Sequence, residues 1–281
     1  TSYICWYLLS RKHLGKILMS DAWISVADGV LLPKDNYEEA LEQVKRLSPA
    51  VLKPANGNKG NGVSVNVTAE NFDVAWQELL KHAESEIIVE RFFSDATEMR
   101  YLVVDGKCVA VVHRLPPHVI GDGSNSIESL VRLKNIKRKL NPDTRKSPIE
   151  LTPFRCGLLA DKGLSPKSVP AAGERVIIDP KGGISSGGDA MDTTSVVHPG
   201  YRRIAEQVWE TLPQPHTIGV DLFARDHTKE PHPGDYIVIE GNTFPGFQTH
   251  LFPSYGEPID VYAPIIESSL RLLEIYYSIP R

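Results

Sequence analysis

The sequence predicts an α+β fold, organised as one domain with subdomains. Segments with helical spacing of apolar residues alternate with strand-like segments along the 281 residues. Short hairpin signals indicate that several strands pair as antiparallel neighbours. The chain shows no internal repeat and no long disordered linker, so its elements are expected to pack together. With 41% hydrophobic residues, it can bury a sizeable core.

Composition excludes several classes of partner. The formal net charge is -4, and the sequence contains no single basic stripe, which argues against nucleic acid. No apolar run approaches the roughly 20 residues that span a bilayer, so no membrane partner is expected. Cys5, Cys108 and Cys156 lack the spacing of a zinc site or a disulfide framework. We therefore expect reduced thiols and a cytoplasmic protein.

The first expected elements surround a glycine-rich loop. Asn36 can cap a helix with apolar positions at helical spacing over 37–44, and a buried strand follows at 50–52. The loop 56–62 is rich in turn residues. Valines alternate with polar residues over 63–67, as in a half-buried strand. The loop is therefore predicted to join two strands.

A second helix, a buried strand and a hairpin come next. Thr68 is the predicted cap of a helix over 72–80, and the strand 87–89 is apolar throughout. Asp105-Gly106 is a strong two-residue turn signal between strands in the segment 99–113.

The rest of the chain contains an expected insertion and a second hairpin. The segment 119–176 has a mixed pattern and is interpreted as an insertion on the core. The remaining predicted elements, in chain order, are a turn at 121–124, a helix at 127–133, a loop at 141–148, a glycine-rich segment at 182–189, a helix at 200–212, hairpin strands at 218–224 and 236–240, and a helix at 261–277.

Three oxygen-bearing side chains of the last hairpin form the sharpest candidate site. Glu240 and Asn242 are two residues apart, so they share one face of a strand, and Asp221 can face them from the other arm. Magnesium binds to few protein carboxylates together with phosphate oxygens and water. The alternative is a polar strand end with its carboxylates in solvent.

Lys53 and the loop behind it are candidates for phosphate binding. Gly57, Gly60 and Gly62 leave the backbone N–H groups accessible, and Lys53 adds a positive charge. The loop lacks the Gly-Lys-Ser/Thr ending of a Walker A motif and is followed by a strand, so neither a P-loop nor a dinucleotide fingerprint is indicated. The alternative is an ordinary hairpin loop.

The region around 89–118 offers candidates for a nucleotide. Val89 and Glu90 can frame a base, Glu98 can bind ribose, and Arg100 lies beside them. A solvated salt-bridge face is the competing interpretation. Arg114 can neutralise a transferring phosphoryl group. His118, in the same segment, is at least as well explained by a structural role.

In this order, these motifs resemble the ATP-grasp superfamily, and the chain is similar to the ATP-grasp modules of cyanophycin synthetase and of bifunctional bacterial glutathione synthetase. Four stretches carry the resemblance: Lys53-Pro54 to Val63, Arg114 to Gly123, Ser185-Ser186-Gly187-Gly188 to Pro199, and Glu240 to Gly246. It implies an ATP-grasp fold in which two α+β subdomains, about 20–88 and 89–281, clasp ATP.

The resemblance also implies roles for individual residues. Lys53 and either Lys12 or Lys16 contact the phosphates, Glu98 contacts the ribose, and Asp221, Glu240 and Asn242 hold magnesium, with two ions expected and manganese able to substitute. Arg114, Lys53, Ser186 and Gly187 form the implied catalytic set. The family usually has Asp before its first lysine, whereas this chain has Ser10-Arg11-Lys12. The choice between Lys12 and Lys16 is therefore open.

The function expected is an ATP- and magnesium-dependent carboxylate–amine ligase that acts through an acyl phosphate on amino acid or peptide substrates. The alternatives are a non-catalytic ATP-binding module and an ATP-grasp phosphotransferase. The resemblance implies an N-terminal substrate domain, absent from this chain, as an expected partner, and a homodimer is one candidate assembly. Acceptor specificity is expected from 141–155, 185–189 and 250–256.

Overall fold

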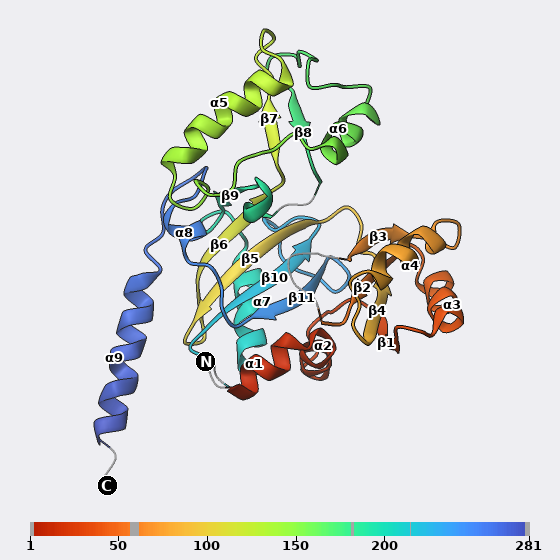
Figure 1. Ribbon diagram of the computed structural model, residues 1–281. Coiled ribbons are helices and arrows are strands. Elements are labelled where there is room, and N and C mark those ends of the chain that lie inside the picture. Colours follow the sequence, from red (N-terminus) through yellow and green to blue (C-terminus); the bar gives the residue numbers. More distant parts are fainter. Residues whose placement is uncertain (1–2, 57–61, 181–182, 214, 279–281) are drawn as a thin grey trace. The chain divides into compact units, whose positions relative to one another are not determined.

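The computed structural model describes residues 3–56, 62–180, 183–213 and 215–278, and these form two compact units. The first unit consists of Thr1–Val109, Val196–Pro245 and Pro264–Arg281. The second consists of Ala110–Ser195 and Gly246–Ala263 (Figure 1). These boundaries differ from the subdomains expected at 20–88 and 89–281, because the strands that carry Asp221 and Glu240 belong to the same unit as the strand that carries Lys53.

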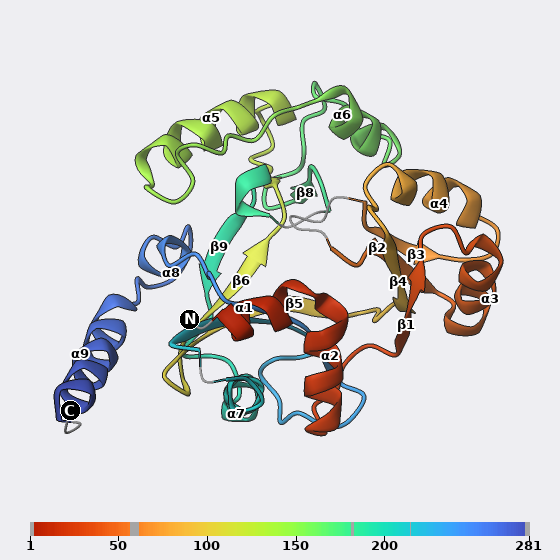
Figure 2. The ribbon, with the colours of Figure 1, turned by 60° about the horizontal axis from the view of Figure 1, so that its bottom comes forward.

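An antiparallel sheet of four strands, in the order β1-β4-β2-β3, forms one part of the first unit. Helices α3 and α4 pack on one face of this sheet (Figure 2). Their core includes Val44, Leu52, Trp76 and Val89. The elements are β1 (Gly29–Pro33), α3 (Tyr37–Leu47), β2 (Ala50–Pro54), β3 (Ser64–Val67), α4 (Phe72–Leu80) and β4 (Glu86–Arg91).

Capping explains where these two helices begin. The Asn36 side chain accepts a hydrogen bond from the Glu39 N–H, as predicted for the start of α3. The predicted cap at Thr68 is wrong. Asn71 occupies the N-cap position of α4, and its side chain accepts a bond from the Thr68 N–H and donates to the Asn66 carbonyl. Asn66 has φ +55°, which interrupts the predicted alternation and leaves Val65 57% exposed.

The first unit also contains strands β11, β10 and β5, which are neighbours in this order in an antiparallel sheet of five strands. Helices α1 and α2 contact β11, and α7 contacts β5. The predicted turn after β5 is confirmed, since Asp105 and Gly106 both have positive φ, of 46° and 78°. The elements are α1 (Tyr3–Ser10), α2 (Lys12–Asp21), β5 (Thr97–Val104), α7 (Pro199–Glu210), β10 (Thr217–Ala224), β11 (Tyr236–Asn242) and α9 (Tyr262–Ser278).

The second unit has its own apolar core, as expected of an insertion near 119–176. Residues of α5 and α6, together with those of the two-stranded sheet β7-β8, form a separate buried cluster. The strand β6 (Lys107–Leu115) begins in the first unit and pairs with β9 in the second. The other elements are β7 (His118–Ile120), α5 (Ile127–Leu140), α6 (Pro153–Ala160), β8 (Arg175–Ile177), the 3₁₀ turn η1 (Ile184–Ser186), β9 (Asp189–Asp192) and α8 (Gln248–Leu251).

Candidate functional site

A buried carboxylate bridges two lysines in the first unit. Lys53 on β2 donates from Nζ to Glu90 Oε1 on β4 over 2.5 Å. Lys16, on α2, donates to the other oxygen of the same carboxylate. Lys53 is 6% exposed and Glu90 is 3% exposed. Each lysine has three ammonium N–H donors and uses one on Glu90, so within the described chain both retain capacity for an anion.

The charges of this group depend on one another. Burial alone would raise the pKa of the Glu90 carboxyl, but Lys53 and Lys16 stabilise its charged form and lower the pKa below its ordinary value. Burial and the neighbouring Lys53 lower the pKa of Lys16 to about 8, against the opposing effect of Glu90. Two cations share one carboxylate, so an added anion would stabilise the group.

Gly29 allows β1 to pass close to Glu90. The register pairs Gly29 with Glu90, and a Cβ at Gly29 would lie 2.6 Å from the Val89 carbonyl oxygen and 2.7 Å from the Glu90 Cβ. Any larger residue would displace the strand that positions Glu90. No local sequence pattern marks Gly29 as important, because its need for glycine arises from its pairing with Glu90, 61 positions along the chain.

A polar face on the second sheet brings together the predicted metal ligands. The register places Asp221 of β10 opposite both Glu240 of β11 and Arg100 of β5, and directly opposed residues share a face. Asn242 lies two residues beyond Glu240, so it lies on that face too. Arg100 donates from Nε and Nη2 to the two Asp221 oxygens, each over 2.7 Å. Although burial opposes it, Asp221 raises the pKa of Arg100.

Helix α2 connects this face with the lysine pair. Lys12 and Lys16 are four residues apart and therefore lie on one side of the helix. Lys16 contacts Glu90, and Lys12 Nζ lies 4.0 Å from Glu240 Oε2. Burial lowers the pKa of Lys12, against the effect of Glu240. Both candidate lysines thus belong to one continuous set of charged groups in the first unit.

The polar face suits a hard cation that takes its remaining ligands from phosphate and water. In the described ranges, no group of three or more His, Cys, Asp and Glu side chains is arranged to hold a metal. Asp221 and Glu240 supply two carboxylates, and Asn242 adds an amide oxygen. Two carboxylates with phosphate oxygens and water form a typical magnesium environment. Arg100 occupies only part of the acceptor capacity of Asp221, because a carboxylate has about four lone-pair sites.

Other predicted site residues of the first unit have mixed outcomes. The Val89 side chain is fully buried in the α3–α4 core, because alternate residues of β4 face opposite sides, and its place beside a base stays a prediction. Glu98 is half-buried on β5, two residues before Arg100. Gly62 has φ +68°, which favours glycine. Gly57 and Gly60 lie outside the described residues.

Arg114, Ser186 and Gly187 lie in the second unit. Arg114 pairs with Ala190 between β6 and β9, and Ser186 ends the 3₁₀ turn before β9. Gly187 has φ +100°, and the Ser186 N–H and hydroxyl both donate to the Gly183 carbonyl, at 3.1 and 2.8 Å. This turn is therefore held in one conformation.

A buried ionic cluster supports that turn. None of its ion pairs was predicted from the sequence. Arg138 of α5 donates to Asp189 Oδ1 over 2.5 Å and to the Gly188 carbonyl over 2.9 Å. Lys134 Nζ lies 2.5 Å from Asp189 Oδ2. Arg155 of α6 donates to the Ser186 carbonyl over 2.6 Å. A signal was available in the sequence, because Arg138 lies at helical spacing from Ile127 and Val131, the apolar buried positions of α5.

The three stretches expected to set acceptor specificity meet around this cluster. Asn141 donates to the Phe252 carbonyl over 2.9 Å, Arg138 donates to the Ser147 carbonyl, and the Ser254 hydroxyl donates to Asp189 over 3.2 Å. His118, nearly fully buried, contacts the same carboxylate at 3.8 Å. Its pKa is lowered by burial and by Lys134. The neutral, enclosed imidazole agrees with a structural role.

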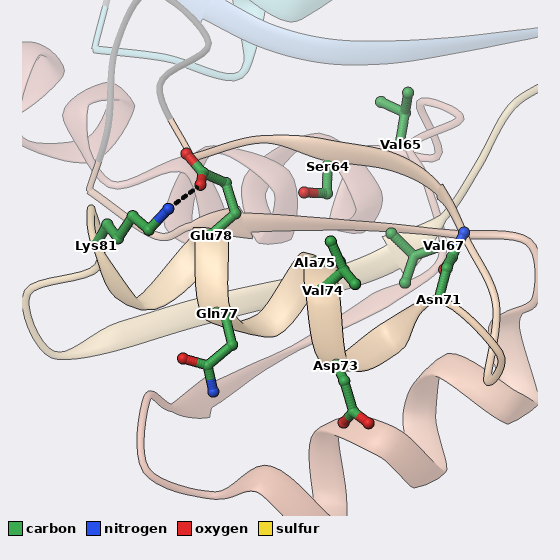
Figure 3. A pocket seen from close by; sticks show the side chains of 10 residues that line it. All are labelled: Ser64, Val65, Val67, Asn71, Asp73, Val74, Ala75, Gln77, Glu78 and Lys81. Atoms are coloured by element: carbon green, nitrogen blue, oxygen red, sulfur yellow. Dashed lines mark hydrogen bonds and ion pairs between the residues drawn. The ribbon is translucent and has the colours of Figure 1, made fainter.

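A surface groove between β3 and α4 lies apart from these groups. Figure 3 shows Val65 and Val74 on its apolar part and the ion pair of Glu78 with Lys81, 2.6 Å long, beside them. All ten lining residues come from Ser64 to Lys81, and none is a candidate site residue. The groove therefore contains none of the residues predicted to bind the nucleotide.

Part of the chain matches an ATP-grasp family. Residues 8–118 match the RimK-like ATP-grasp domain, and this range includes Lys12, Lys16, Lys53 and Glu90. The fold agrees with this match, since the structure combines helices with antiparallel sheets.

Individual relatives extend the similarity along the chain. Cyanophycin synthetase of Crocosphaera subtropica is 32% identical over 268 residues, covering 92% of this chain and 30% of the relative. The glutathione biosynthesis bifunctional protein GshAB of Clostridium perfringens is 32% identical over 264 residues, covering 91% and 33%. The chain thus spans about a third of the length of these relatives.

Solved structures agree on the fold. The bifunctional glutathione synthetase of Pasteurella multocida aligns with a TM-score of 0.72 and 27% identity, over 96% of this chain and 37% of that one. D-alanine–D-alanine ligase of Bacillus anthracis aligns with a TM-score of 0.54 at 14% identity, over 98% of this chain and 72% of that one, which shows the fold alone.

Among the helices that the structure describes, none has the length and apolar composition that a membrane span requires.

Proposed function

We propose that this chain is the ATP-using part of a carboxylate–amine ligase that releases ADP and forms an amide or peptide bond. The observation that carries the proposal is the continuous charged set of the first unit, in which Lys16 and Lys53 share Glu90 while Asp221 and Glu240 face each other across β10 and β11. The relatives named cyanophycin synthetase and glutathione synthetase support the same reaction class.

The two lysines are proposed to bind the ATP phosphates. Their unused N–H donors can bond to phosphate oxygens, and the negative charge stabilises both ammonium groups in a site that burial otherwise disfavours. Glu90 holds the ammonium groups in place before ATP arrives, which reduces the ordering that binding requires. Lys16 is the stronger candidate of the two α2 lysines, since it shares the carboxylate with Lys53.

Asp221, Glu240 and Asn242 are proposed to hold magnesium, which neutralises phosphate charge when bound. We propose two ions, with manganese as a substitute. Arg100 orients the Asp221 carboxylate through two parallel hydrogen bonds. Glu98 on the ribose, and Arg114, Ser186 and Gly187 at the transferred phosphoryl group, remain predictions from the sequence.

The proposed reaction has two bond exchanges. A substrate carboxylate oxygen bonds to the γ-phosphorus as the bond from that phosphorus to the β–γ bridging oxygen breaks, giving an acyl phosphate and ADP. The amine nitrogen then bonds to the acyl carbon, phosphate leaves with the former carboxylate oxygen, and the nitrogen loses a proton. Such transfer depends on positioning and charge neutralisation. Amino acids or short peptides are the proposed substrates, and the cytoplasm the proposed location.

The test is ADP release by the purified protein with magnesium and ATP against pools of amino acids and short peptides. We expect release that requires both a carboxylate and an amine, and that falls at least about a hundredfold in Asp221→Asn and Glu240→Gln. Asp235→Asn, which alters an exposed carboxylate beyond the polar face, is the matched control. Turnover that survives both site substitutions would contradict the metal assignment. A phosphorylated product without a condensed product would favour a phosphotransferase, and ATP binding without turnover would favour a binding module.

A further inference from the structure

The outer side of helix α5 is an exposed apolar surface on the second unit. Ile127 and Val131 of this helix pack into the core of the unit, and Arg138 is buried in the cluster with Asp189. The opposite side presents Leu133, Ile136 and Leu140, which are 44%, 56% and 83% exposed. We refer to these three residues as the α5 ridge. Because the buried side anchors the helix, the ridge is presented in a fixed conformation.

The ridge has the spacing of a helix-pairing seam. Its residues are separated by three and then four positions, which is the a-d-a pattern of a heptad. On this register, Arg132 and Lys139 occupy g positions and Lys137 occupies an e position. All three are exposed, and their side chains form no ion pair or hydrogen bond with another described residue. Every e and g position beside the α5 ridge is therefore a cation.

We propose that the α5 ridge docks an amphipathic helix that carries apolar residues at its own a and d positions and carboxylates at its e and g positions. Apolar residues of such a helix would cover Leu133, Ile136 and Leu140, and its carboxylates would lie beside the three flanking cations. This inference does not depend on the proposed ligase activity.

The same pattern disfavours other occupants. A second copy of α5 would place cations against cations, since all three flanking positions are basic. Nucleic acid offers no partner for an apolar ridge and draws its affinity from phosphate contacts. An anionic membrane is an extended surface, so it would also be repelled by the rest of the protein, whose formal net charge is -4. A single acidic helix can contact the ridge without approaching that acidic remainder.

The test uses the whole protein and a fluorescent synthetic helix of three heptads with Leu at a, Ile at d and Glu at e and g. A sister peptide has Gln at the e and g positions, and another has Lys. We expect anisotropy to report binding of the Glu peptide, at least about tenfold weaker binding of the Gln peptide and none of the Lys peptide, with affinity falling between 50 and 200 mM salt.

Two pairs of variants locate the contact. Lys137→Glu should weaken binding about fivefold, whereas Lys45→Glu, which makes the same charge change at an exposed position of α3, should leave it unchanged. Leu140→Gln should weaken binding, whereas Leu270→Gln, at an exposed position of α9, should not. All four positions are exposed, so folding should persist and can be checked by circular dichroism.

Three results would overturn the proposal: equal binding of the Glu and Gln peptides, equal affinities of Lys137→Glu and Lys45→Glu, or no binding of the Glu peptide to the unsubstituted protein. Vesicles of anionic phospholipid and duplex DNA serve as competitors. If either displaced the Glu peptide at a lower concentration than the unlabelled peptide does, a membrane or nucleic-acid surface would replace the helix as the occupant.

Discussion

Each of the two units contains a buried carboxylate between two cations, but the two groups differ in how their donors are used. In the first unit, Lys16 and Lys53 each give one bond to Glu90 and keep two N–H donors. In the second unit, Arg138 uses donors on the carbonyls of Ser147 and Gly188 as well as on Asp189. The lysine group is thus suited to gain an anionic ligand, whereas the arginine group holds the chain in place.

Removing Arg138 should have the largest effect on stability. Arg138→Met leaves the Asp189 carboxylate buried with one cation fewer and leaves two carbonyl groups without their donor. We expect a loss of about 3–5 kcal/mol in the free energy of unfolding, measured by urea denaturation. Arg145→Met, at an exposed position of the same unit, is the control. A loss below about 1 kcal/mol would contradict a structural role for the cluster.

Removing Lys53 should act on binding more than on folding. In Lys53→Met, Lys16 still neutralises Glu90, while the ATP phosphates lose a charged donor. We expect the affinity for ATP to fall by about 2–3 kcal/mol, a factor of roughly thirty to more than a hundred, in calorimetric titrations. Lys81→Met removes an exposed lysine at the C-cap of α4 as a comparison. An unchanged dissociation constant would mean that the lysine pair is structural, like Arg138.

Two glycines test whether each carboxylate must be placed accurately. A Cβ at Gly29 would lie 2.6 Å from a backbone oxygen beside Glu90, and a Cβ at Gly188 would lie 2.7 Å from two backbone oxygens beside Asp189. We expect either alanine substitution to cost about 1–3 kcal/mol of stability in thermal or urea unfolding. Gly29→Ala should also weaken ATP binding, and by more than Gly188→Ala, because Gly29 lies opposite Glu90, the carboxylate between the two lysines. A loss of affinity in Gly188→Ala as large as that in Gly29→Ala would remove the contrast between the units.

The smallest expected effect is the uptake of part of a proton when ATP binds. In the ligand-free chain the pKa of Lys16 is about 8, and phosphate contact should raise it, so ATP binding near pH 8.5 should take up a fraction of a proton. Calorimetry in two buffers of different ionisation enthalpy measures this uptake, and Lys16→Arg should abolish it. An uptake retained in that variant would assign the proton to another group.

The same lowered pKa fixes the sign of a stability trend. Between about pH 8 and the ordinary value of 10.5, the unfolded chain holds a proton on Lys16 that the folded chain has lost. Stability without ATP should therefore rise with pH across this window. Lys16→Met should flatten the rise.

Local patterns predicted much of the fold. The Asn36 cap, the Asp105-Gly106 turn and the convergence of Asp221 with Glu240 follow from rules that act within a few residues or across one hairpin. The predicted helix at 127–133 was too short, since α5 continues to Leu140 with Arg138 on its buried side. Helix α2 was missed because Arg11 stands at its N-cap position without a side-chain hydrogen bond, leaving no capping signal.

The ionic groups required the tertiary structure. Lys16 and Glu90 are 74 positions apart, and Arg138 and Asp189 are 51 apart, so no local pattern pairs them. Strand alternation identified Glu90 as one of several charged residues near a strand end, but only the pairing of β4 between β1 and β2 buries it. The burial of the Val89 side chain likewise depends on which face of β4 the helices cover.

The order in which the chain is made has a consequence for how the first unit forms. This unit consists of three separate stretches, and its second sheet pairs β5 with β10, which begins 113 residues after β5 ends. During synthesis, the first 86 residues of the second unit, Ala110–Ser195, leave the ribosome before β10 does. The edge of β5 that β10 covers therefore stays unpaired while this segment emerges. Slow synthesis should lengthen the time in which this edge can pair with a non-native strand.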